Sequence, residues 1–245
     1  MPEPDLPSVP GSRDRLQEAL RISRTIRELE ARVQDDREPI ARKVRRWQRL
    51  RTPQIPDWAQ ELRPHDPAWE ERFDREAGRI RGALGPVVED VQHIGSSSIS
   101  HLPSKPMLDL AVAVRDDPAS PRLVEAFTAI GYEHFGNSPC DHEADWYWKT
   151  GADLVMVVHL CHAENPWRTT AVNFRDYLRV HPEESELYER RKRELKAGEA
   201  GSLLEYSLGK LALFYEISAR ADEWRAAAGP NQPISAATTP GNPST

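Results

Sequence analysis

The sequence VQHIGSSS at residues 91–98, followed by KPMLDLAVAV at residues 105–114, decides the fold of this chain. The first segment predicts an apolar strand that runs into a Gly-Ser turn. The second predicts another apolar strand that carries one carboxylate, Asp109. Glycine and serine let backbone N–H groups approach an anion closely, and an aspartate on an apolar strand is costly unless it is paired or binds a metal. The pattern therefore predicts a phosphate-binding turn beside a metal ligand, which is the layout that a nucleoside triphosphate and Mg²⁺ require.

The turn and the acidic strand each have a structural alternative. Gly95, Ser96 and Ser97 could present backbone N–H groups and two hydroxyls to a phosphate, or they could simply form the tight turn that closes a strand. Asp109 could bind a metal, or it could form a salt bridge with Lys105 or Arg175.

The same residues resemble the signature of a known family. HIGSSS (93–98) through KPMLDL (105–110) is similar to the signature of the GrpB-like family, which is classed with the nucleotidyltransferase superfamily. NFRDYLR (173–179) resembles the Phe-Arg-Asp-x-Leu-Arg block of the family. Further matches follow the family's order: His159 at the end of a strand, HPE at 181–183, Tyr188, Lys192, Tyr206 and Lys210. The resemblance covers residues 64–225.

The resemblance implies an α+β (α/β) fold, with a nucleotidyltransferase-like mixed sheet backed by helices and a C-terminal helical portion. It implies Mg²⁺ as a cofactor, held by Asp109, and a nucleoside triphosphate as a substrate. The site residues that it implies are Asp109, Ser96 and His159 for catalysis, and Gly95, Ser97, Lys105, Arg175 and Lys210 for binding phosphate or substrate.

One position departs from the wider superfamily, whose active members commonly have a second carboxylate two residues after the first. Ala111 occupies that position here. A carboxylate from another strand or loop could complete a metal site, and the candidates are Asp141, Glu143, Asp145 and Asp153. His159 occupies the stretch comparable to the third superfamily carboxylate. Because a neutral imidazole binds Mg²⁺ poorly, His159 is expected to contact substrate or to act as a general base.

Other polar and aromatic residues near these motifs have two interpretations. The chain strongly prefers arginine, so Lys105, Lys192 and Lys210, which fall on motif positions, are better candidates for specific phosphate contacts. Lys192 could equally be a solvated surface residue. Arg175 and Arg179 lie on one helix face and form either an anion-binding fork or ion pairs with Asp176. His93 is expected to be structural, and Trp146 and Trp148 are expected to share a core-facing side of a strand.

The composition limits the class of protein. A chain of 245 residues can bury one core and carry a smaller appendage. Its net charge of −6 argues against general attraction to nucleic acids or membrane surfaces. It has no apolar run of membrane-spanning length and no secretory leader pattern, so a cytoplasmic location is predicted. Cys140 and Cys161 are far apart and fit reduced thiols rather than a disulfide framework.

Composition and periodicity divide the chain into four parts. Residues 1–11 and 226–245 are predicted to be disordered, and residues 63–225 to form the main domain. Residues 12–62 are predicted to form a helical hairpin and a linker. The hairpin could pack on its own domain, mediate a homodimer or cover the site. In the main domain, strands are expected at 87–94, 108–114, 132–135, 146–149 and 153–160, and helices at 66–84, 121–130, 169–180, 182–197 and 202–224.

Two functions from different classes follow from these observations. The first is a nucleotidyltransferase-like enzyme that binds a nucleoside triphosphate with Mg²⁺ and transfers to, or activates, a small-molecule acceptor. The second is a non-catalytic nucleotide- or phosphate-binding module with a degenerate metal site, which Ala111 favours.

Overall fold

The computed structural model describes residues 22–28, 45, 53–137, 144–197 and 203–228. Its centre is a five-stranded sheet in the order β1-β2-β5-β4-β3. The strands are β1 (Val88–Ile94), β2 (Met107–Val114), β3 (Glu133–Asn137), β4 (Asp145–Thr150) and β5 (Val155–His162). Strands β2 and β5 are parallel, and the other neighbouring pairs are antiparallel. The predicted α+β fold with a mixed sheet is therefore confirmed.

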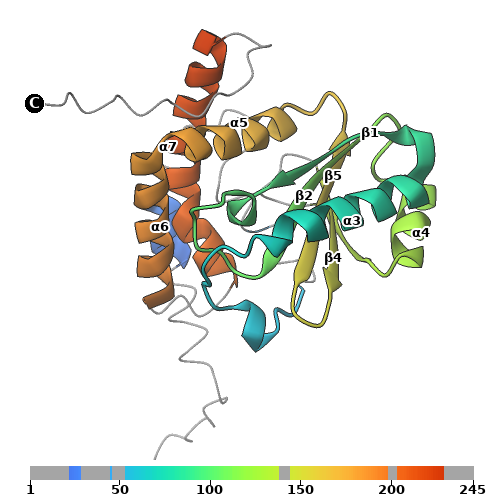
Figure 1. Cartoon of the computed structure of the whole chain (residues 1–245), viewed down its shortest axis with the longest axis horizontal. Helices are drawn as coiled ribbons and strands as arrows, with labels where there is room; N and C mark the ends of the chain where they lie inside the picture. The colour runs from blue at the N-terminus through green and yellow to red at the C-terminus, as the bar shows by residue number, and fades with distance from the viewer. Residues whose placement is uncertain (1–21, 29–44, 46–52, 138–143, 198–202, 229–245) are drawn as a thin grey trace, which may run out of the picture.

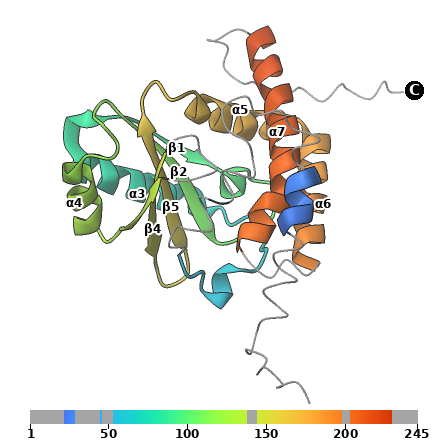
Figure 2. The same ribbon diagram turned by 180° about the vertical axis from the view of Figure 1, so that it is seen from behind.

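Helices cover both faces of this sheet (Figure 1). Helices α3 (Ala68–Leu84) and α4 (Pro121–Ala129) pack on one face. Helices α5 (Pro166–Val180), α6 (Pro182–Ala197) and α7 (Leu203–Ala228) gather at the other side of the molecule. Seen from behind in Figure 2, α6 and α7 again lie side by side, away from α4. Three short 3-10 helices complete the order, at Asp57–Ala59 (η1), Gly85–Val87 (η2) and Ser96–Ser98 (η3).

Local signals explain where these helices begin and end. The Asp66 carboxylate accepts a hydrogen bond from the backbone N–H of Ala68 at 2.9 Å, which satisfies one of the first N–H groups of α3. Gly85 ends that helix with a φ of 73°. The side chain of Asn165 accepts from the N–H of Trp167, and Pro166 occupies the first turn of α5. This cap starts α5 three residues before the predicted start at residue 169.

The side chains of β2 point alternately to the main core and to the face of the sheet that carries Asp109. Leu108, Leu110 and Val112 point to the core beneath α3 and α4 and are fully buried. Because successive side chains of a strand point to opposite faces, Asp109 and Ala111 lie on the other face, toward α5 and α7. The apolar residues of β2 thus fix the direction in which its single carboxylate points.

The two ends of the chain are described only in part. Residues 22–28 are helical, and Ile22 packs against Leu208 and Ala212 of α7. Of the expected second helix of the hairpin, only Arg45 is described, and it is helical. Of the segments expected to be disordered, residues 1–11 and 229–245 lie outside the described residues. Residues 226–228, expected to belong to the disordered tail, form the end of helix α7. In the described part of the chain, no helix has the length and apolar character needed to span a bilayer.

Candidate functional site

A cavity of about 260 Å³ lies between the Asp109 face of the sheet and helices α5, α6 and α7. Its lining from the sheet and its loops is Ile94, Gly95, Ser96, Ser104, Lys105, Met107, Asp109, Trp146, Trp148, Val157 and His159. Its lining from the helices is Trp167, Ala171, Phe174, Tyr188, Lys192, Tyr206, Ser207, Lys210, Leu211 and Phe214. Six of the predicted site residues therefore meet at one cavity: Gly95, Ser96, Lys105, Asp109, His159 and Lys210.

The Asp109 carboxylate lies directly against the Gly-Ser turn. Asp109 pairs with Ile94, the last residue of β1, so its side chain stands beside Gly95. A Cβ added to Gly95 would collide with Oδ2 of Asp109 and would lie 3.0 Å from its Cγ. Gly95 also has a φ of 69°, which L side chains rarely adopt. Glycine is thus required twice at this position, by the backbone and by the carboxylate.

His159 is a titratable neighbour of this carboxylate. Its Nε2 lies 3.6 Å from Oδ1 of Asp109, and its ring centroid lies 5.2 Å from that of Trp167. The side chain of Asp109 is 30% exposed and that of His159 is 13% exposed, so the carboxylate remains accessible from the cavity. The two side chains form an acid–imidazole pair on the cavity wall.

Of the described residues that line the cavity, Asp109 is the one carboxylate that could take part in holding Mg²⁺. Within the described ranges, no group of three or more His, Cys, Asp or Glu side chains is arranged to hold a metal ion. Magnesium usually takes one or two carboxylates and completes its shell with substrate phosphates and water. Asp109 alone meets that minimum when a polyphosphate is bound.

The two described candidates for completing a metal site, Asp145 and Asp153, lie away from Asp109. Ala111 is fully buried in an apolar cluster with Ile94, Trp167 and Ala171. Asp145 lies on the opposite face of the sheet, where its Oδ2 is 3.4 Å from Nε2 of His134. Asp153 is an exposed ion-pair partner of Arg72. The other two candidates, residues 141 and 143, lie outside the described residues.

Three lysines approach the cavity from different elements. Lys105 comes from the loop before β2, and Lys192 and Lys210 come from α6 and α7. The Nζ atoms of Lys105 and Lys210 lie 4.0 and 4.6 Å from the centroid of the Tyr206 ring. Two ammonium groups thus contact one aromatic ring, which attracts each of them through its π face.

Lys192 is the most buried of the three, at 2% exposure, and its Nζ donates to the carbonyl oxygen of Pro103. Burial, together with repulsion from Lys210, lowers the pKa of Lys192 to about 7. The same two causes lower the pKa of Lys105 to about 8. Of the described residues that line the cavity, Asp109 is the only carboxylate, so the local charge favours an anionic ligand.

The serines of the turn have separate partners. The hydroxyls of Ser96 and Ser104 lie 3.0 Å apart at the cavity wall. Ser97 is fully buried and its Oγ is 3.0 Å from Nε2 of His93, so the structure does not bring Ser97 to the cavity. His93 stacks on Phe73, and burial lowers its pKa to about 3. His93 therefore has the structural position expected for it.

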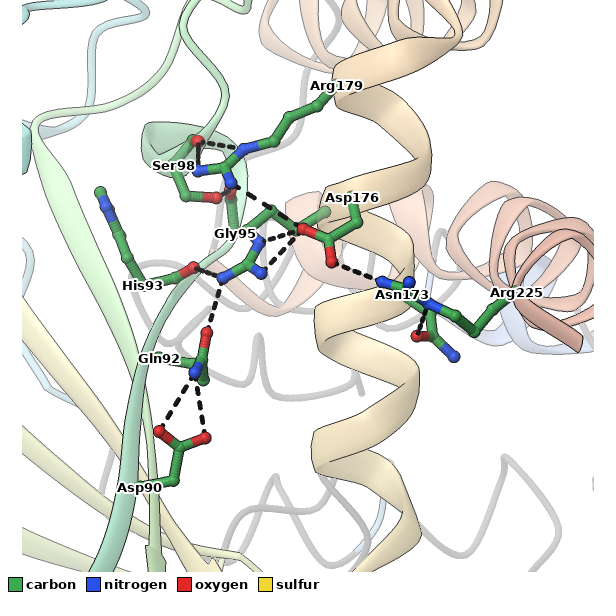
Figure 3. A network of polar contacts seen from close by, with 10 residues as sticks. Asp90, Gln92, His93, Gly95, Ser98, Asn173, Asp176, Arg179 and Arg225 are labelled. Atoms are coloured by element: carbon green, nitrogen blue, oxygen red, sulfur yellow. Dashed lines mark hydrogen bonds and ion pairs between the residues drawn. The ribbon is translucent and has the colours of Figure 1, made fainter. Parts of the chain in front are cut away.

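Arg175 is not among the residues that line the cavity, and its side chain joins α5 to β1. Figure 3 shows this network of polar contacts around Gln92, His93 and Asp176. Arg175 donates to the carbonyl oxygen of His93 and to Oε1 of Gln92, each at 2.9 Å, and pairs with Asp176 at 2.7 Å. Arg179 donates to the carbonyl oxygen of Ser98 at 2.7 Å. The two arginines thus hold the backbone on both sides of Gly95 instead of facing the cavity.

Several lining residues were not identified as site residues from the sequence. The sequence allows Lys192 either a solvated surface position or a phosphate contact, and the structure buries it at the cavity. Trp146 and Trp148 share one side of β4, as expected, but both line the cavity. Strand alternation places the two rings together but cannot show whether a helix covers them, so no sequence signal separated these two outcomes.

Comparison with known proteins identifies the family. The family model described as GrpB protein matches residues 60–220. The chain is 31% identical to the UPF0157 protein BH1888 of Halalkalibacterium halodurans over 66% of this chain and 87% of the relative. It is also 31% identical to the UPF0157 protein YqkA of Bacillus subtilis, over 64% of this chain but 46% of that longer relative.

A solved structure gives the same result. The crystal structure of the conserved protein GrpB from Enterococcus faecalis aligns with a TM-score of 0.60 and 28% identity. The alignment covers 67% of this chain and 100% of that one. The matched residues include every strand of the sheet and every described lining residue of the cavity. The chain therefore belongs to the GrpB protein family.

Proposed function

We propose that this member of the GrpB protein family is a nucleotidyltransferase-like enzyme that binds a nucleoside triphosphate in the cavity and transfers its nucleotidyl group to a small-molecule acceptor. One observation carries the proposal: three lysines, one of them almost fully buried, share a single cavity with the Asp109 carboxylate. Lysines held together in this way repel one another, and a polyphosphate relieves that repulsion. The assignment to the nucleotidyltransferase superfamily rests on the resemblance in residues 93–110.

The lysines and the turn would hold the triphosphate. In the proposal, Lys105, Lys192 and Lys210 contact the phosphates, and the Ser96 hydroxyl contributes a further donor at the turn. Asp109 would hold one Mg²⁺, which when bound supplies charge neutralisation at the phosphate oxygens. Each of these side chains lines the cavity, which supports this division of roles.

The transfer step needs a base near the acceptor. A hydroxyl oxygen of the acceptor attacks the α-phosphorus, a new P–O bond forms, and the bond from the α-phosphorus to the bridging oxygen breaks to release pyrophosphate. His159 accepts the hydroxyl proton at Nε2, 3.6 Å from the Asp109 carboxylate, which stabilises the resulting imidazolium. The lysines neutralise the charge that develops on the leaving pyrophosphate.

A specific observation favours a second candidate, a non-catalytic module that binds a nucleotide or another phosphate. The position of the second superfamily carboxylate is Ala111, which is fully buried in an apolar cluster. That cluster leaves no room for a second charged ligand without repacking, so the site could bind phosphates without transferring them.

A thermal-shift titration tests binding. The melting temperature is followed with ATP, GTP, CTP, UTP and pyrophosphate, each with and without Mg²⁺. A ligand at 100 times its Kd stabilises the native state by about 2.7 kcal/mol, which raises the Tm of a chain of this size by about 5–10 °C. Lys105→Ala and Lys210→Ala should lose most of this rise. Lys196→Ala, which removes an exposed lysine of α6 outside the cavity lining, should keep it.

The Asp109→Asn variant separates the two candidates. If it binds nucleotide but loses turnover that the unaltered chain shows, the enzyme is supported. If the unaltered chain binds nucleotide yet releases no pyrophosphate with Mg²⁺ or Mn²⁺ across a broad set of acceptors, the binding module is supported. Absence of any shift with all five ligands would reject the enzyme and would also reject a module that binds one of these nucleotides or pyrophosphate.

A further inference from the structure

The cavity has two chemically different ends. Lys105 lies in the loop before β2, and Lys192 donates to the carbonyl oxygen of Pro103 in the same loop. Lys210 shares the ring of Tyr206 with Lys105. Trp146 and Trp148 line the cavity from β4, which is separated from β2 by β5. Neighbouring strands lie about 4.8 Å apart, so the backbone of β4 is about 10 Å from that of β2. A ligand anchored by its phosphates at the lysines leaves the tryptophan end for a second molecule.

The tryptophan end presents aromatic and aliphatic surface. Trp146 pairs with His159 and Trp148 pairs with Val157, so all four side chains stand on the same face of the sheet. The two indole rings are 5.8 Å apart and nearly perpendicular. The Nε1 group of Trp148 already donates to the Thr150 hydroxyl at 3.2 Å, so this ring offers the cavity its apolar surface. A flat apolar group fits such a wall best.

The charge of the unliganded cavity disfavours a cationic ligand. Among the described lining residues, the lysines outnumber the one carboxylate, and that carboxylate stands beside His159. An amine that entered before the phosphates would therefore meet repulsion, which a bound polyphosphate would cancel. A polynucleotide is also a poor fit, because the chain has a net charge of −6.

We propose that the acceptor is a small, planar molecule that carries a hydroxyl group and packs against Trp146 and Trp148, with the hydroxyl directed toward Asp109 and His159. This inference rests on the proposed function, because the lysine end must hold the nucleotide for the tryptophan end to hold the acceptor. It adds the chemical class of the acceptor, which the motifs of the sequence do not specify.

Calorimetric titration of the full chain with matched probes tests the proposal. Indole-3-ethanol is planar, neutral and hydroxylated, and tryptamine has nearly the same shape with a positive charge. In the absence of pyrophosphate, indole-3-ethanol should bind at least tenfold more tightly than tryptamine, which carries an ammonium group in place of the hydroxyl. Trp146→Ala should weaken indole-3-ethanol at least tenfold and leave pyrophosphate binding unchanged, which also shows that the variant folds. Trp146→Phe, which keeps an aromatic ring, should retain most of the affinity.

The outcomes separate this proposal from the function on which it rests. If pyrophosphate binds but indole-3-ethanol does not, or if tryptamine binds as well, the acceptor class is wrong while the phosphate site stands. The same conclusion follows if Trp146→Ala has no effect on the neutral probe. If indole-3-ethanol binds and no nucleotide or pyrophosphate does, the nucleotidyltransferase proposal is wrong, and with it the role of this ligand as an acceptor.

Discussion

The close contact between Gly95 and the Asp109 carboxylate gives the sharpest test of the site. Gly95→Ala should destabilise the chain for two reasons. The φ of 69° and ψ of −174° at this residue cost a side chain about 1–3 kcal/mol. The new Cβ must also displace the Asp109 carboxylate, and overpacking of this kind typically adds about 1–3 kcal/mol. The total expected loss is about 2–6 kcal/mol.

Gly85 provides a matched control for the backbone part. Its φ of 73° and ψ of −149° lie in a similar region, and a Cβ added there meets nothing within 4 Å. Gly85→Ala should therefore cost only the strain, about 1–3 kcal/mol. The difference between the two variants measures the collision with the carboxylate.

A double-mutant cycle with Asp109→Ala isolates that collision. Removing the carboxylate leaves only the Cβ of residue 109, at 3.1 Å, near the new methyl group. The cost of Gly95→Ala should then fall toward that of Gly85→Ala. Urea unfolding supplies the free energies from the midpoint and the m-value. If the two changes add within about 0.5 kcal/mol, the carboxylate does not rest on the turn, and the geometry proposed for the site is wrong.

Three further predictions concern buried charges. The pKa of Lys192 is about 7 in the folded state and 10.5 in the unfolded state, so the free energy of unfolding should rise as the pH increases between these values. Urea titrations of Lys192→Met should lack this part of the rise, and an unchanged profile would contradict the burial of Lys192. The pKa of His93 is about 3 in the folded state and 6.5 in the unfolded state, so the free energy of unfolding should fall as the pH decreases from 6.5. In an acid titration, His93→Gln should show a shallower fall than the unaltered chain, and equal slopes for the two would refute this prediction. Asp176 pairs with Arg175 at 2.7 Å and with Arg225 at 2.9 Å, and Asp176→Asn removes the carboxylate from both arginines. The free energy of unfolding measured in urea should fall by about 3–5 kcal/mol, and a loss below about 1 kcal/mol would exclude a structural role for this network.

Most of the secondary structure could be predicted from local signals. The apolar run of residues 108–114 and the capping of residue 68 by Asp66 are properties of short segments, and the structure confirms them as β2 and the start of α3. Predicted ends were less accurate where the signals were weaker. Helix α7 passes the predicted end at residue 224 because Ala226, Ala227 and Ala228 are good helix formers.

The site was predictable in part. The Gly-Ser turn and Asp109 were found because glycine, serine and a lone acid in an apolar strand are unusual at those positions, and strand pairing then brings them together. Arg175 could not be placed, since an arginine on a helix face contacts either a ligand or a neighbouring backbone, and here it contacts the carbonyl oxygen of His93. The choice depends on which element packs against α5.

The sequence alone determined the strands, the helices and the position of one carboxylate after a glycine turn, because these follow from patterns within continuous segments, and its motifs identified the family, whose resemblance implied the mixed sheet. The tertiary structure decided which charges and rings share a cavity. Lys105, Lys192 and Lys210 lie far apart in the chain, and only the packing of α6 and α7 against the loop before β2 buries them together and lowers the pKa values of the first two. Side-chain burial and mutual repulsion depend on distances between elements, which no local pattern encodes.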